Sequence, residues 1–178
     1  AKIRDIGHLN AASAVLSWDQ NTYMPPLAAE SRGEQMAIIS RISHEWATSD
    51  EIGKLLDDLQ PYADSLDSDA DDARLIKLVK RDYDLATRVP TDFVVEFSKA
   101  TTAAFSAWAQ ARAKSEFTLF EPTLTRVVEL NRQFATYFPE ADHPYDALLN
   151  QYEPGMKSAD VKAIFDALRP QQVALIKA

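Results

Sequence analysis

Two adjacent prolines, Pro25 and Pro26, constrain the fold of this chain more than any other local feature. Proline has no backbone N–H, and its ring disfavours helical geometry at the residue before it, so a regular helix should not run through the pair. Apolar residues at helical spacing lead up to Trp18, and a second helical pattern begins near Ala28. The chain must therefore turn between two helices at this point.

The residues beside this turn include a carboxylate and a guanidinium that can meet across it. Asp19 lies at the end of the first helical pattern, and Arg32 lies just inside the second. An aspartate next to a tryptophan is usually a cap or an ion-pair partner, so we favour a structural contact over a catalytic one. We predict that Trp18, Asp19 and Arg32 hold the corner between the first two helices and do not touch substrate.

The spacing of glycines and prolines predicts an all-α protein. The chain has four glycines, and its nine prolines fall mostly between apolar-periodic runs, with no alternating strand pattern. Long helices with short connections indicate a multi-helix bundle, which we expect to be one helical domain over residues 1–178. The predicted boundary signals are a capping box at Thr48–Glu51, a stop before Pro61, an acidic cap at Ser68–Asp72, a stop before Pro90, a start at Thr91, a capping box at Thr118–Glu121 and a stop at Pro170.

Composition argues against several classes of partner and location. The net charge is −8 and the sequence pI is near 4.9, which opposes binding to nucleic acid or to an anionic membrane. The absence of cysteine excludes disulfides, thiolate metal ligands and a cysteine nucleophile. No apolar run reaches the length of a membrane span, and the first residues lack a signal-peptide core. We therefore expect a cytoplasmic protein without a nucleic-acid or membrane partner.

No catalytic, cofactor-binding or metal-binding residue is predicted in this chain. His8, His44 and His143 are too far apart for a His-Glu-x-x-His zinc helix, and after His44-Glu45 the second ligand position holds Thr48. We assign the histidines surface or capping roles. The acidic Asp64–Asp72 loop lacks the central glycine and distal glutamate of a calcium-binding EF-hand, so a solvated cap is favoured.

Two stretches carry a resemblance to the Taq-type zinc metallocarboxypeptidases. Within Ser17–Gln35 the order is Trp-Asp, Thr, Met-Pro, then Arg and Gln. Within His143–Met156 the order Tyr-Asp, Leu-Leu, Tyr-Glu-Pro-Gly-Met resembles a signature that related oligopeptidases share. The resemblance covers essentially the whole chain but only the N-terminal part of the family. The family's catalytic segments are missing, and we take His143-Pro144-Tyr145 and Asp72–Ile76 as coincidental near-matches.

The resemblance implies the N-terminal helical layer of a zincin-type helical metallopeptidase. The complete enzyme would release single C-terminal residues from peptides through a zinc-polarised water and a glutamate base, as a cytoplasmic homodimer. Zinc is then the cofactor of the full-length enzyme, with none bound to this chain, which would form one wall of the substrate cleft and be inactive alone. The alternatives are a non-enzymatic helical interaction module and the N-terminal region of a related zinc oligopeptidase.

Both ends of the sequence suggest a piece of a longer chain. Ala1 precedes a helical pattern already under way, and a new pattern after Pro170 has barely begun at Ala178. The helices expected after Thr91 and Thr118 carry aromatic stripes that would then lack part of their cover. Uncovered apolar surface favours association, so we expect the chain by itself to form a dimer.

Overall fold

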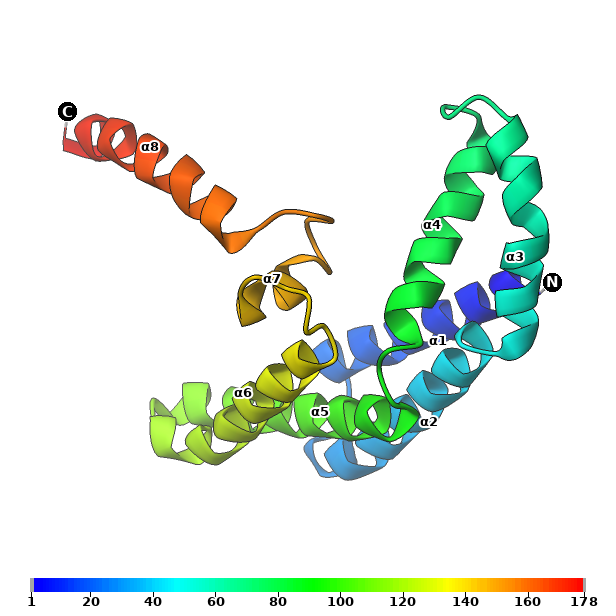
Figure 1. The fold of residues 1–178 in the computed structure, drawn as a ribbon. Coiled ribbons are helices and arrows are strands. Elements are labelled where there is room, and N and C mark those ends of the chain that lie inside the picture. Colours follow the sequence, from blue (N-terminus) through cyan, green and yellow to red (C-terminus); the bar gives the residue numbers. More distant parts are fainter. Residues whose placement is uncertain (1, 178) are drawn as a thin grey trace. The chain divides into compact units, whose positions relative to one another are not determined.

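The computed structural model describes residues 2–177, and over this range the chain is helical with no strand (Figure 1). This confirms the predicted all-α class. The helices are α1 (Lys2–Thr22), the 3-10 helix η1 (Pro26–Ala28), α2 (Ala29–Ala47), α3 (Asp50–Ser65), α4 (Asp71–Ala86), α5 (Thr91–Lys114), the 3-10 helix η2 (Phe117–Leu119), α6 (Glu121–Thr136), α7 (Pro144–Leu149) and α8 (Ser158–Lys177).

The chain forms two compact units, Ala1–Val127 and Val128–Ala178. In the first unit α2 packs along α5 and α1 packs along α2, while α3 pairs with α4. The second unit holds the C-terminal part of α6 together with α7 and α8. A single domain over residues 1–178 stays a prediction. None of the helices in the described part is long and apolar enough to cross a membrane.

Small side chains let α2 and α5 pack closely. Gly33 and Ala37 are buried on α2, and Thr102 and Ala104 are buried on α5. A Cβ added at Gly33 would lie 3.7 Å from the Thr102 Cγ2, so these two residues meet across the interface. Small residues of α5 therefore face a neighbouring helix.

The three tryptophans are partly exposed. Trp18 is 57% exposed, Trp46 41% and Trp108 43%. Helical spacing alone favoured a buried tryptophan beside the Pro25–Pro26 turn, and that interpretation is wrong. On α5, Phe93 is buried at 6% exposure, whereas Trp108 is not, in keeping with an aromatic stripe that lacks part of its cover. The reason is that α5 packs mainly on α2, so its buried positions are mostly small and the large indole keeps contact with solvent.

The sequence analysis predicted that two helices end at prolines, and the structure shows that both helices continue through them. Pro61 lies inside α3 and Pro170 lies inside α8, so the two patterns on either side of Pro170 form one helix. Proline removes one intrahelical hydrogen bond, so the carbonyl four residues earlier loses its helical donor. Both prolines lie on exposed stretches, where water can satisfy that carbonyl.

The predicted caps are also placed differently. The Thr48 hydroxyl donates to the His44 carbonyl at 2.8 Å, so it closes α2 and does not cap α3. The Thr118 hydroxyl donates to the Glu116 carboxylate within η2, and α6 begins only at Glu121. At α4 the residue before the helix is Ala70, which offers no capping side chain. The acidic residues of its first turn still interact favourably with the positive end of the helix dipole.

Candidate functional site

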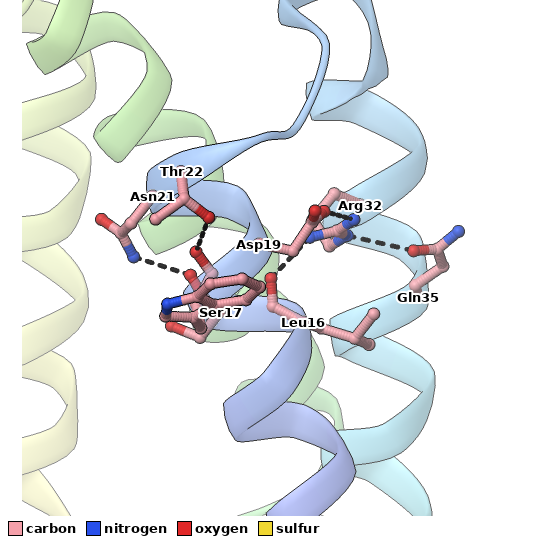
Figure 2. A network of polar contacts seen from close by, with 8 residues as sticks. Leu16, Ser17, Asp19, Asn21, Thr22, Arg32 and Gln35 are labelled. Carbon is pink, nitrogen blue, oxygen red and sulfur yellow. Dashed lines mark hydrogen bonds and ion pairs between the residues drawn. The ribbon is translucent and has the colours of Figure 1, made fainter.

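Arg32 is the centre of a polar network that joins α1 to α2 at the corner (Figure 2). Its Nη2 donates to Asp19 Oδ2 at 2.5 Å, and its Nη1 donates to the Leu16 carbonyl at 2.5 Å. Its Nε donates to Gln35 Oε1 at 3.1 Å. The carboxylate and guanidinium therefore meet across the Pro25–Pro26 turn, as the sequence predicted.

The burial of the Arg32 guanidinium determines how much this network contributes to stability. The Arg32 side chain is 11% exposed, whereas the Asp19 side chain is 33% exposed. A cation that is nearly removed from water needs good acceptors, because an unpaired buried charge costs several kcal/mol. Asp19 and the Leu16 carbonyl supply two of them from α1. The contact locks the first turn of α2 to the last turns of α1.

The last turn of α1 is closed by its own polar side chains. The Thr22 hydroxyl donates to the Trp18 carbonyl at 2.8 Å, and the Asn21 amide donates to the Ser17 carbonyl at 2.7 Å (Figure 2). The Trp18 ring meets Tyr23 edge to face, with centroids 5.5 Å apart. These side-chain donors add a second hydrogen bond to carbonyls of the last turns of α1, just before the chain leaves the helix.

An open groove of about 460 Å³ lies between α2 and α5. Its lining is mostly small or apolar, with Gly33, Thr102 and Ala103 among the residues that form it. Lys99 Nζ on α5 and Glu34 Oε1 on α2 form an ion pair at 2.6 Å, and both side chains remain about half exposed. The groove can accept an extended or narrow ligand, but it holds no nucleophile paired with a base.

The three histidines occupy separate settings. His8 is exposed on α1, and His44 is half-buried on α2, where burial lowers its pKa against the opposing effects of the Val89 backbone and of Glu45. His143 precedes α7, and its Nδ1 accepts a hydrogen bond from the Tyr145 N–H at 3.1 Å. The capping role is thus confirmed for His143.

Among residues 2–177, no three His, Cys, Asp or Glu side chains lie close enough together to hold a metal ion. The two segments that resemble catalytic motifs of the family, Asp72–Ile76 and His143-Pro144-Tyr145, both lie at helix starts. Asp72 lies in the first turn of α4 and accepts a hydrogen bond from the Tyr62 hydroxyl at 2.9 Å, while His143 and Pro144 start α7.

Asp146 is the residue that the sequence reasoning missed. It is 8% exposed, and its carboxylate completes a capping box with His143. The sequence signal was available, because His-Pro-x-Asp places a proline and an acid at the preferred positions of a helix start. The helical spacing of Leu148, Leu149 and Tyr152 in the same segment predicts that all three pack inward. That prediction is wrong for Tyr152, which is 83% exposed.

Comparison with known proteins identifies the family of this helical chain. The profile of the Carboxypeptidase Taq (M32) metallopeptidase family matches residues 1–178. The chain belongs to the M32 carboxypeptidase family. This confirms the resemblance drawn from the Trp-Asp and Tyr-Glu-Pro-Gly segments.

Individual M32 relatives match nearly the whole chain. Carboxypeptidase 1 of Bacillus subtilis is 34% identical over 179 residues, covering 98% of this chain and 34% of that protein. Thermostable carboxypeptidase 1 of Pyrococcus furiosus is 32% identical over 182 residues, covering 99% and 35%. The BsuCP crystal structure superposes with a TM-score of 0.92 at 32% identity, over 99% of this chain and 35% of that one. The chain spans about a third of the length of the curated relatives it matches.

Proposed function

We propose that this chain is the N-terminal helical part, over residues 1–178, of a zinc-dependent carboxypeptidase that releases C-terminal residues from peptides. The observation that carries the proposal is the family match along the whole chain, combined with coverage of only about a third of the relatives. The remaining part would supply the zinc ligands and the general base. In this proposal no step of the reaction is assigned to residues 2–177.

In this proposal the chain contributes one wall of the substrate cleft. Support comes from the α2–α5 groove, whose mostly small lining leaves room for an extended peptide. The Asp19–Arg32 contact would act at a distance, by holding α1 and α2 in the orientation that shapes this wall. Its residues would then affect stability and leave transition-state binding unchanged.

The proposed assembly is a homodimer in the cytoplasm with peptides as the substrate. Exposed large apolar side chains support association, among them Leu27 at 99% and Trp108 at 43% exposure. Sedimentation of the 178-residue chain over a range of concentrations tests this part. We expect a monomer–dimer equilibrium. A chain that stays monomeric at high concentration and unfolds cooperatively would contradict it.

The gene sequence beyond Ala178 tests the proposal at least cost. We expect a downstream His-Glu-x-x-His segment followed by a glutamate ligand. A stop codon directly after Ala178 would contradict the proposal and favour a helical interaction module. If the segment is present, the products distinguish the peptidases, because a carboxypeptidase releases single residues and an oligopeptidase releases longer fragments.

A further inference from the structure

One carboxylate in the second unit binds the starts of two helices. Asp146 Oδ2 accepts a hydrogen bond from the His143 N–H at 3.2 Å, at the N-terminus of α7. Asp146 Oδ1 accepts one from the Ser158 N–H at 2.7 Å, and Ser158 is the first residue of α8. The Ser158 hydroxyl also bonds this carboxylate, and these bonds are the main cause of its lowered pKa. Asp146 therefore connects α7 to α8.

Helix starts are suitable partners for an anion. The first N–H groups of a helix lack intrahelical acceptors, and the helix dipole places partial positive charge there. An ordinary cap satisfies only its own helix, whereas Asp146 also reaches a helix that begins 12 residues later. Asp146 as a residue is 8% exposed, so little of its surface is left for water to contact.

Within residues 2–177, few other contacts hold the start of α8 in place. α8 buries no side chain against this part of the protein, so packing inside residues 2–177 contributes little to its position. The ion pair between Lys157 and Asp142 is exposed, and exposed pairs contribute little to stability. In the connecting loop, Asn150 Oδ1 accepts a hydrogen bond from the Gly155 N–H at 2.9 Å. Gly155 has a φ of +80°, a geometry that favours glycine.

We propose that Asp146 is a latch that holds α8 to α7, and that opening it lets α8 pivot about the loop of residues 150–157. With the carboxylate in place, both helix starts are held at a fixed separation. Without it, the bonds that remain in the loop, among them Asn150–Gly155 and Met156 N–H to the Glu153 carbonyl, hold the loop's own turns but not the first amide of α8, so in the 178-residue chain α8 moves independently of α7. This inference does not depend on the proposed catalytic function.

The distance between the two helices tests the latch directly. The chain has no cysteine, so Tyr145→Cys on α7 and Leu175→Cys on α8 provide two unique sites for spin labels. Both native side chains are exposed, at 55% and 78%. With the labelled chain diluted in an excess of unlabelled chain, so that distances within one molecule dominate even in a dimer, we expect one narrow distance distribution by pulsed electron paramagnetic resonance. Adding Asp146→Asn should broaden it, with far-UV circular dichroism confirming that the helices remain.

Two further variants separate the latch from general damage. Ser158→Pro removes the backbone N–H that donates a hydrogen bond to Asp146 Oδ1. Proline is favoured at the first position of a helix, so α8 should still form. This variant should broaden the distribution as Asp146→Asn does. Asp142→Asn removes only the exposed partner of Lys157 and should leave the distribution narrow.

Hydrogen exchange gives a second readout. The Ser158 amide should exchange about tenfold faster or more in Asp146→Asn, because a bond to a charged acceptor is lost. An unchanged narrow distribution in both Asp146→Asn and Ser158→Pro would overturn the proposal. Equal broadening by Asp142→Asn would also overturn it, because the ion pair would then hold the helix.

Discussion

The α1–α2 corner and the α7–α8 loop each place a carboxylate between two helices, but the donors that surround it differ. Asp19 is 33% exposed and faces the guanidinium of Arg32. Asp146 is 8% exposed and accepts hydrogen bonds from the backbone of His143 and from Ser158. The corner thus relies on a charge pair that solvent partly reaches, and the loop relies on neutral donors at helix starts. The two should respond differently to substitution, salt and acid.

The largest effect is expected from Arg32→Ala, which removes the charge at the centre of the corner. The change deletes three hydrogen bonds and leaves the Asp19 carboxylate and the Leu16 carbonyl without this partner. We expect a loss of about 2–3 kcal/mol in the free energy of unfolding, measured by urea denaturation. Arg41→Ala is the matched control, since its pair with Glu45 is exposed. An equal loss in both variants would remove the distinction between the corner and a surface ion pair.

Salt should separate the two carboxylates. Asp19→Asn should cost about 1–2 kcal/mol at low ionic strength, because the nearly buried Arg32 loses its counter-charge. That cost should shrink modestly in about 1 M salt, because the Asp19 side chain is one-third exposed and dissolved ions can reach it. The destabilisation by Asp146→Asn should change little, because its donors are neutral. Thermal melts of both variants across salt concentrations test this, and identical salt responses would contradict the comparison.

Acid should weaken the loop in a defined window. The pKa of Asp146 is lowered mainly by its bonds to Ser158, with smaller help from His143. The unfolded chain therefore binds the proton more readily, so this contribution is complete above the unfolded pKa of 3.8 and is lost as the pH falls through the lower folded value.

The charged groups around Asp146 must be controlled in that experiment. Lys157 interacts with Asp146, Asp142 and Asp160, and His143 lies beside the carboxylate. Exchange of the Ser158 amide should accelerate below about pH 4 in the parent chain, after correction for intrinsic exchange. Asp146→Asn should lack this step, while Asp142→Asn should keep it. A step that survives in Asp146→Asn would assign the titration to another carboxyl group.

The smallest effect is expected at the His143 cap. His143→Ala removes the acceptor for the Tyr145 N–H and should cost about 0.5–1 kcal/mol of unfolding free energy. His143→Asn should preserve stability, because asparagine is a preferred cap residue. Both are measured by urea denaturation. A loss for His143→Ala as large as that for Arg32→Ala would mean that the loop depends on this side chain more than on Asp146.

The two regions also differ in how far the sequence could predict them. The Pro25–Pro26 turn limits the chain so strongly that Asp19 and Arg32 could be paired from the sequence alone. The bond from Asp146 to Ser158 depends on how a 12-residue stretch closes, and no local pattern encodes that closure. Pro61 and Pro170 failed as helix stops for a similar reason. Whether a proline is tolerated depends on solvent reaching the freed carbonyl, which is a tertiary property.

The central claim is that these residues provide a helical scaffold of an M32 carboxypeptidase and no catalytic chemistry. The most direct measurement is the zinc content of the 178-residue chain after dialysis against zinc-containing and then zinc-free buffer, with an assay of C-terminal residue release on the same sample. Carboxypeptidase 1 of Bacillus subtilis, assayed identically, is the positive control for residue release. We predict no stoichiometric zinc and no release of residues by this chain. One zinc per chain together with residue release would contradict the account.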